Sequence, residues 1–161
     1  MSIIIFSRQV RSGKTTELLH WCDQQKNVAG ILMPDIDGKR KVLDLRSGVM
    51  FDIECHDPVN TKEALVQVGR YHFYTAVFET INSLLDQTLS DDPEWMIIDE
   101  VGKLELEEKG FYNLVKKVIY DHENKRTTAN ILLVVRDSIC DEVISRFNIN
   151  TYTLVHGLEG L

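Results

Sequence analysis

The tetrapeptide Gly13-Lys14-Thr15-Thr16 is the clearest chemical signal in the sequence. It stands between an apolar run typical of a buried strand, residues 3–6, and a stretch typical of a helix, residues 14–26. A loop that joins a strand to a helix directs backbone N–H groups inward, and the helix N-terminus adds partial positive charge. We therefore expect Gly13 to let the backbone approach a phosphate, Lys14 to reach the β- and γ-phosphate oxygens, and the Thr15 hydroxyl to bind magnesium.

The loop departs from the common pattern G-x-x-x-x-G-K-[ST], because Arg8 occupies the place of the first glycine. That glycine serves the tight turn that leaves the strand, so Arg8 either adopts a permitted conformation or reshapes the loop. Arg8 and Arg11 either add positive charge beside the phosphates or point to solvent. The residues predicted to bind the nucleotide are Arg8, Gln9, Val10, Arg11, Ser12, Gly13, Lys14, Thr15 and Thr16.

A second acidic signal follows the apolar run 95–98, which ends in Asp99 and Glu100. In enzymes with this type of loop, a neighbouring strand ends in an aspartate that holds magnesium. A glutamate after it can orient the attacking water. Successive strand residues point to opposite sides, so we expect Asp99 to serve the metal while Glu100 faces the γ-phosphate.

An α/β sheet covered by helices on both faces must position these residues, because short apolar runs alternate with longer amphipathic stretches. The segments around residues 46–48 predict a β-hairpin, and residues 35–38 read as a turn. The predicted strands are 3–6, 28–33, 41–45, 49–53, 71–74, 96–98, 131–135 and 152–155, and the predicted helices are 14–26, 76–89, 111–122 and 139–147.

Length and composition favour a single domain over residues 1–161 with a substantial core. The formal net charge of −7 argues against a nucleic-acid partner. No apolar run is long enough to cross a bilayer. Three scattered cysteines, Cys22, Cys55 and Cys140, favour a reducing compartment, and we expect a cytoplasmic protein.

The stretch 99–106, D-E-V-G-K-L-E-L, resembles the acidic motif of a family of small P-loop nucleoside triphosphatases, which reads D-E-[IV]-G-K-[ML]-E. That family includes the human cancer-related nucleoside triphosphatase. Further similarities occur in the family's order and cover most of the chain. They are Gly30-Ile31, Gly38-Lys39-Arg40, Asp44-Leu45-Arg46-Ser47-Gly48, Val68-Gly69-Arg70-Tyr71 and Phe78-Glu79.

This resemblance implies a RecA-like P-loop NTPase fold, a sheet sandwiched by helices with a β-hairpin insertion. It also implies slow, magnesium-dependent hydrolysis of ATP, GTP and other nucleoside triphosphates with little selectivity for the base. By matching position, Lys14 is the phosphate lysine, Thr15 and Asp99 hold Mg²⁺, and Glu100 orients the water. Of the family's loop pattern G-x-P-G-x-G, the chain keeps Gly13 but lacks the first two glycines and the proline, and it also lacks the hairpin Gly-Phe pair and the C-terminal N-R pair.

Hydrolysis also needs positive charge on the transition state beyond Lys14 and the metal. Arg136 follows the predicted strand 131–135, where a γ-phosphate sensor could lie, but a surface arginine beside Asp137 is the favoured interpretation. The same two interpretations apply to Arg40, Arg46 and Arg70. A neighbouring subunit of a homo-oligomer could supply one of these arginines. We interpret the histidines as surface or core residues, residues 105–108 as a solvated helix start, and Trp21, Tyr71, Phe73 and Tyr74 as core rather than base-stacking residues.

Three functions remain open at this stage. The leading one is a nucleoside-triphosphate phosphohydrolase, because the two motifs occur in the required order. A nucleotide-binding regulatory module with little turnover is the second, because the loop glycines are missing. The third is a small-molecule or nucleotide kinase, which would need an acceptor pocket.

Overall fold

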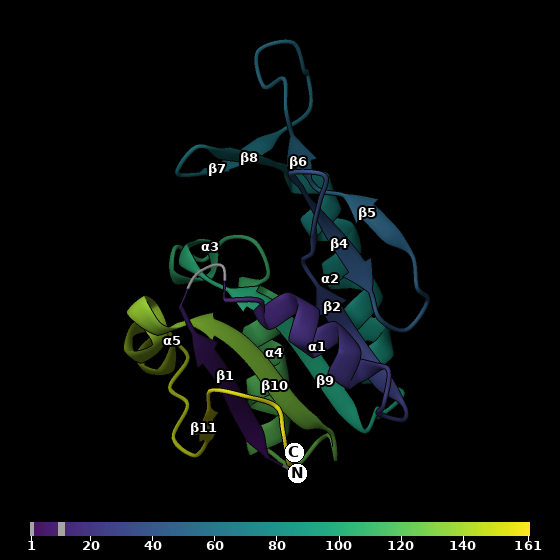
Figure 1. Cartoon of the computed structure of the whole chain (residues 1–161), viewed down its shortest axis with the longest axis vertical. Helices are drawn as coiled ribbons and strands as arrows, with labels where there is room; N and C mark the ends of the chain where they lie inside the picture. Colours follow the sequence, from purple (N-terminus) through teal and green to yellow (C-terminus); the bar gives the residue numbers. More distant parts are fainter. Residues whose placement is uncertain (1, 10–11) are drawn as a thin grey trace.

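The computed structural model describes residues 2–9 and 12–161, and its centre is a mostly parallel β-sheet (Figure 1). Within the described residues the strand order is β11-β1-β10-β9-β2-β4-β3, with β5 paired to β4. All pairs among the first five of these strands are parallel. Their bounds are β1 Ile3–Arg8, β2 Val28–Leu32, β9 Trp95–Val101, β10 Asn130–Arg136 and β11 Thr153–Val155. The carboxyl ends of these strands therefore meet at one edge of the sheet.

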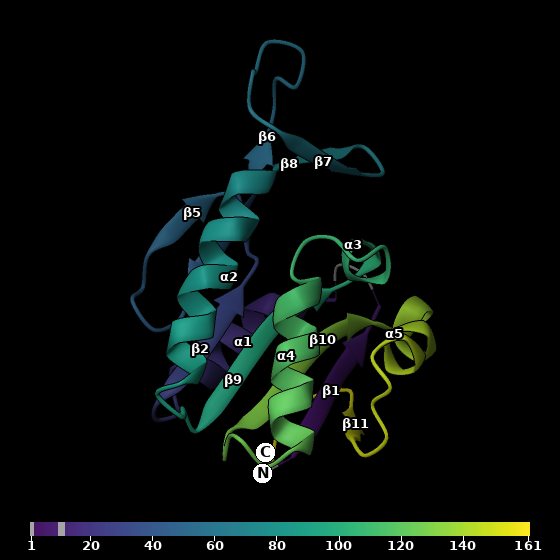
Figure 2. The same ribbon diagram turned by 180° about the vertical axis from the view of Figure 1, so that it is seen from behind.

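Helices cover both faces of the sheet, as the alternating pattern predicted. Helix α1 (Lys14–Cys22) lies on one face, and α2 (Thr75–Leu89) and α4 (Tyr112–Glu123) lie on the other, as the two opposite views show (Figures 1 and 2). The short helix α3 (Lys103–Leu106) follows β9, and the 3-10 turn η1 (Asp137–Ile139) leads from β10 into α5 (Cys140–Arg146). The expected mixed α/β architecture is confirmed.

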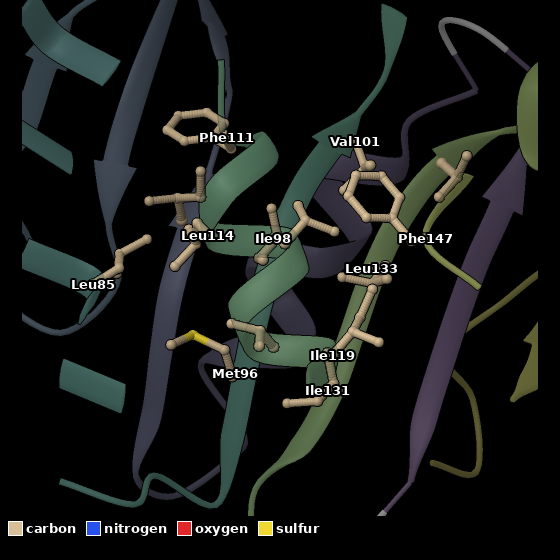
Figure 3. Packing of buried hydrophobic residues seen from close by; sticks show 14 of the residues in the cluster. Leu85, Met96, Ile98, Val101, Phe111, Leu114, Ile119, Ile131, Leu133 and Phe147 are labelled. Carbon is tan, nitrogen blue, oxygen red and sulfur yellow. The ribbon is translucent and has the colours of Figure 1, made fainter. Parts of the chain in front are cut away.

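Burial on both faces explains why the parallel strands read as continuous apolar runs. Along β9, Met96 and Ile98 belong to the apolar cluster under α2 and α4, whereas Trp95 and Ile97 belong to the cluster under α1. Figure 3 shows the first cluster, in which Ile98 lies beside side chains of α4 and β10. This two-sided packing holds β9, the strand that carries Asp99 and Glu100, within the sheet.

The second part of the molecule is antiparallel. The hairpin predicted over 41–45 and 49–53 is confirmed as β4 (Lys39–Asp44) paired with β5 (Met50–Asp52). The strand predicted at 71–74 is β8 (Tyr71–Tyr74). It forms a separate small sheet with two strands that the sequence analysis missed, β6 (Glu54–Cys55) and β7 (Leu65–Val68), and this sheet lies at the far end of the molecule in Figure 1.

Two local predictions need correction. Residues 35–38 were read as a turn, but Asp35–Ile36 form β3, which pairs with β4 across the two-residue turn Asp37-Gly38. Both turn residues have positive φ, 53° and 76°, as an Asp-Gly hairpin turn requires. The helix predicted over 14–26 ends at Cys22, because the chain then turns and Asn27 takes a left-handed φ of 49° before β2.

The other boundaries agree with the prediction to within three residues at each end. Within the described residues, no helix is both long and apolar enough to cross a membrane.

Candidate nucleotide site

Residues 12–16 lie at the carboxyl end of β1, where α1 begins. Gly13 has a φ of 80°, a left-handed conformation that favours glycine, and an added Cβ would meet no atom within 4 Å. The Lys14 ammonium donates hydrogen bonds to the backbone carbonyls of Arg8 at 3.0 Å and Gln9 at 2.7 Å. Burial lowers the pKa of Lys14, and the carboxylates of Asp99 and Glu100 oppose this shift. The lysine is therefore held across the loop and faces the acidic residues.

Arg8 does not need the conformational freedom of glycine. It is the last residue of β1, opposite Arg136 of β10, and its φ is not in the left-handed region. Its guanidinium pairs with Glu17 of α1 and lies 4.9 Å from the centre of the Phe6 ring. Arg8 thus points neither to the phosphates nor freely to solvent. Val10 and Arg11, also predicted to bind nucleotide, lie outside the described residues.

Asp99 lies near the end of β9 and is 2% exposed. One of its oxygens, Oδ2, accepts a hydrogen bond from the Thr15 hydroxyl at 3.0 Å and another from the Met33 backbone N–H at 3.0 Å. Burial raises the pKa of Asp99 to about 6, and the two hydrogen bonds work against that rise. The motif after β1 and the motif in β9 therefore meet, although 84 residues separate them.

Glu100 sits in a β-bulge. Leu133 and Val135 of β10 pair with Ile98 and Val101, so two residues of β9 face one residue of β10. Glu100 has a φ of 64°, which is strained for a glutamate. Among the described residues, the carboxylates of Asp99 and Glu100 share no hydrogen-bond partner, in agreement with the prediction that the two point differently.

Two arginines hold the Glu100 carboxylate. Arg40 Nη1 donates to Oε2 at 2.6 Å, and Arg136 Nη2 pairs with Oε1. The favoured interpretation of Arg136 as a surface arginine beside Asp137 was wrong. Arg136 ends β10, next to β9, so its side chain reaches the same sheet edge as Glu100. Arg46, in contrast, pairs with Asp91 elsewhere on the surface.

These residues surround a cleft of about 320 Å³, within the usual range of small-ligand sites. Arg8 and Gln9 do not line it, and they contribute only the carbonyls that hold Lys14. The cleft is lined by Ser12, Gly13, Lys14, Thr15, Thr16, Leu19, Met33, Pro34, Asp35, Arg40, Tyr71, Asp99, Glu100, Val134, Val135 and Arg136.

The sequence profile of a family described as NTPase matches residues 4–156. The chain belongs to the NTPase family. A comparison with curated protein sequences gives no match. Family membership supports nucleotide binding and nucleoside triphosphatase activity in general.

Two solved structures share the NTPase fold seen here. The crystal structure of THEP1 from the hyperthermophile Aquifex aeolicus superimposes with a TM-score of 0.69 and 18% identity, over 98% of this chain and 90% of that one. The solution structure of a human cancer-related nucleoside triphosphatase superimposes with a TM-score of 0.64 and 20% identity, over 99% of this chain and 90% of that one. The P-loop NTPase fold predicted from the sequence is confirmed.

The NTPase family points to a divalent cation, and the donor set here fits one. The Thr15 hydroxyl and the Asp99 carboxylate are adjacent oxygen ligands, and the buried Asp99 carboxylate lacks a salt bridge to any described residue. No group of three or more His, Cys, Asp or Glu residues among those described could hold a metal by itself. A hard cation here would therefore rely on few protein ligands and on the phosphates of a substrate.

The segment after the bulge corrects another prediction. Glu105, read as part of a solvated helix start, is 2% exposed. Its two carboxylate oxygens accept the backbone N–H groups of Gly102 at 2.8 Å and Phe111 at 2.9 Å, which closes the loop between β9 and α4. Burial raises the pKa of Glu105, and these hydrogen bonds oppose the rise. Glu107 and Glu108 are exposed, as predicted.

The aromatic residues are mainly core residues, as expected. Trp21 packs edge-on against Trp95 with ring centres 4.7 Å apart, and Phe73 contacts Phe78 in the same manner at 6.3 Å. Tyr71 and Tyr74 are only half-buried, and Tyr71 also lines the cleft. Its place beside the site has no signal in the local sequence, since β8 reaches the cleft only through the tertiary fold.

Proposed function

We propose that this chain is a magnesium-dependent nucleoside-triphosphate phosphohydrolase that converts ATP or GTP to the diphosphate and phosphate. The observation that carries the proposal is the hydrogen bond between Thr15 and Asp99, which brings the loop and the acidic strand end together at one cleft beside Glu100. Slow turnover and little selectivity for the base are carried over from the family resemblance.

The loop would bind the triphosphate. Backbone N–H groups at the start of α1 would donate to phosphate oxygens, and Lys14 would exchange its bonds to two loop carbonyls for bonds to the same phosphates. Thr15 and Asp99 would hold Mg²⁺, which supplies charge that offsets the phosphate oxygens. A bound cation would also keep the buried Asp99 ionised.

Glu100 would orient the attacking water. In the structure Arg40 and Arg136 form ion pairs with the Glu100 carboxylate, and both arginines line the cleft. A γ-phosphate placed there would attract the same two guanidinium groups, because phosphate oxygens accept their hydrogen bonds as a carboxylate does. Binding of the substrate would thus free Glu100 for water and place positive charge where the transition state develops negative charge.

Phosphate release from ATP, GTP, CTP and UTP, with and without Mg²⁺, tests this proposal. We expect release with every nucleotide, only with the metal, and a decrease in kcat of about 10²- to 10⁴-fold for Glu100→Gln. Lys14→Ala should lose both binding and turnover. Glu107→Gln is the matched control, because Glu107 is exposed and, among the described residues, forms an ion pair with Lys109 alone. Release by the unchanged chain that does not exceed that of Glu100→Gln would refute the proposal.

A nucleotide-binding module with little turnover is the second candidate. It is favoured by the two arginines that occupy Glu100, since hydrolysis stays slow if the triphosphate does not displace them. Tight magnesium-dependent binding by calorimetry, without phosphate release in a single-turnover mixture, would select it. A single-domain organisation, a cytoplasmic location, a homo-oligomer and the lack of a nucleic-acid partner stay predictions from the sequence.

A further inference from the structure

A second cavity of about 110 Å³ adjoins the nucleotide cleft on the side of Glu100. The two spaces share Met33, Arg40, Tyr71, Glu100 and Arg136, so Glu100 and its two arginines stand at their junction. Away from this junction the walls are mainly apolar. The apolar side chains that line the cavity are Met33, Val68, Tyr71, Phe73, Phe78, Leu104, Phe111 and Ile139.

The cavity is built from segments that are held in place by packing. Phe78 of α2 contacts Phe111 with ring centres 4.8 Å apart, and both are buried. The two backbone hydrogen bonds to Glu105 fix the loop that carries Leu104 and Phe111. The β7–β8 hairpin, which carries Val68, lies on the same side of the molecule as α3 in both views (Figures 1 and 2). The space is therefore preformed.

Hydrolysis alone gives no reason for such a space. Water needs a position beside Glu100 and the γ-phosphate, whereas the apolar side chains that form most of the cavity wall beyond that position offer it no hydrogen-bond partners. An apolar cavity of roughly 150 Å³ holds a benzene molecule, so this one fits a group of about four or five carbons. A molecule with such a group and one hydroxyl would place the hydroxyl at the junction.

We propose that this cavity is an acceptor site for small aliphatic alcohols, to which the chain transfers the γ-phosphoryl group. The inference rests on the proposed function for the nucleotide cleft. The alcohol oxygen forms a bond to the γ-phosphorus, and the bond between that phosphorus and the β–γ bridging oxygen breaks. The hydroxyl proton passes to the Glu100 carboxylate, and the products are an alkyl phosphate and a nucleoside diphosphate. Arg40 and Arg136 contact the transferred group.

The polar groups along the cavity agree with an uncharged acceptor. Glu105 also lines it, but its two oxygens already accept backbone hydrogen bonds. Lys103 and Ser138 complete the polar lining. A charged acceptor would have to place its charge against Phe78 and Phe111, which offer no compensation. Selectivity would therefore come from the size of the apolar group.

The test uses the full chain with Mg²⁺ and ATP in the presence of ethanol, 1-propanol, 1-butanol, 3-methyl-1-butanol or 1-octanol at equal concentrations. Phosphorus NMR measures alkyl phosphate and inorganic phosphate in the same sample. We expect the ratio of alkyl phosphate to phosphate to rise about fourfold per methylene up to a butyl or isopentyl group. It should then fall at octanol, which exceeds the cavity.

Two variants of Val68 connect this ratio to the cavity. Val68→Phe fills the space and should reduce the ratio at least tenfold, while Val68→Ala enlarges it and should move the optimum to longer alcohols. Val59→Phe is the matched control, because Val59 is 88% exposed and lines neither the cavity nor the nucleotide cleft. It should leave the ratio unchanged. The alanine variant keeps the test decisive if the phenylalanine variant does not fold.

The outcomes separate this inference from the proposed function. Phosphate release without alkyl phosphate from any alcohol, or a ratio that does not depend on chain length, overturns the acceptor site and leaves hydrolysis standing. A lack of both products overturns the hydrolase as well. A length optimum that is unchanged in Val68→Ala also rejects the cavity as the acceptor site.

Discussion

The parallel core and the antiparallel part of this chain contribute different things to one site. From the core come Lys14 and Thr15, at the start of α1, and Asp99, near the carboxyl end of β9. From the antiparallel part come Arg40 of β4 and Tyr71 of β8, which reach the cleft from the other side. The core thus carries the residue types suited to phosphate and metal, and the antiparallel part carries one arginine that pairs with Glu100 and one tyrosine that lines the same cleft.

Packing separates the two regions as clearly as chemistry does. Five of the six residues of β1 are buried, whereas the strand pair β7–β8 has only one buried residue, Phe73. A half-exposed hairpin tolerates changes of sequence better than a strand buried on both faces. We expect the core to lose stability when it is changed and the antiparallel part to lose or change activity.

The largest effect is expected at Gly30 of β2. Its φ is +115°, and an added Cβ would lie 1.9 Å from the carbonyl oxygen of Ile97, so Gly30→Ala must push β2 away from β9. We expect a loss of at least about 3 kcal/mol in the free energy of unfolding, measured by urea denaturation. Gly48→Ala, in the β4–β5 turn, meets no atom within 4 Å and should lose only about 1 kcal/mol. Equal losses of unfolding free energy in the two variants would contradict the expected difference between the core and the antiparallel part.

The two arginines give the next largest effect. Arg136 belongs to the core and Arg40 to the antiparallel part, yet both hold Glu100. Replacing either by glutamine should reduce kcat about 10²-fold, or roughly 2.7 kcal/mol, because each loses charge that stabilises the transition state. Phosphate release measures this, with Arg46→Gln as the control, since Arg46 pairs with Asp91 outside the cleft. A faster variant would mean that the arginines only restrain Glu100.

Glu105 tests the loop that the two regions share. Glu105→Gln keeps the size of the side chain, but its amide group can no longer accept both backbone N–H groups. We expect a loss of about 1–3 kcal/mol in the free energy of unfolding, since one buried N–H is left without a partner. The exposed Glu107→Gln should cost almost nothing. Similar urea midpoints for the two variants would argue against a structural role for the buried carboxylate.

The smallest effect is expected at Arg8. Arg8→Ala breaks a half-exposed ion pair with Glu17 and should cost less than about 1 kcal/mol. Because residue 8 is extended, Arg8→Gly should bring no gain in phosphate release over Arg8→Ala. A clear gain with glycine would show that the loop needs the turn that the common pattern provides.

Sequence periodicity predicted most of the core, because strands buried on both faces and amphipathic helices have strong local patterns. It missed β3, β6 and β7, which are two to four residues long and partly exposed, so no alternation could develop. The left-handed turn at Asp37-Gly38 was visible as a D-G pair, but residues 35–38 were predicted to be only a turn and not part of a hairpin with a strand on each side.

The candidate site divides in the same way. The phosphate loop and the Asp99-Glu100 pair were predicted because each is a short motif attached to its own strand. Arg136 was misread, because a strand-end arginine has the same local pattern whether it faces solvent or a carboxylate. Glu105 was misread for a similar reason, since the acidic run 105–108 gives no sign that one member turns inward.

The sequence by itself determined which residues offer the groups that phosphate and metal binding need, because that chemistry depends on residue type and on the local strand-to-loop-to-helix order. Only the tertiary structure decided what faces Glu100. Its partners are 36 and 60 residues away. Arg136 lies on β10, which pairs with β9, whereas Arg40 lies on β4, which the sheet order separates from β9 by β2. The apolar cavity beside Glu100 exists for the same reason, since its walls come from separate segments that only the fold brings together.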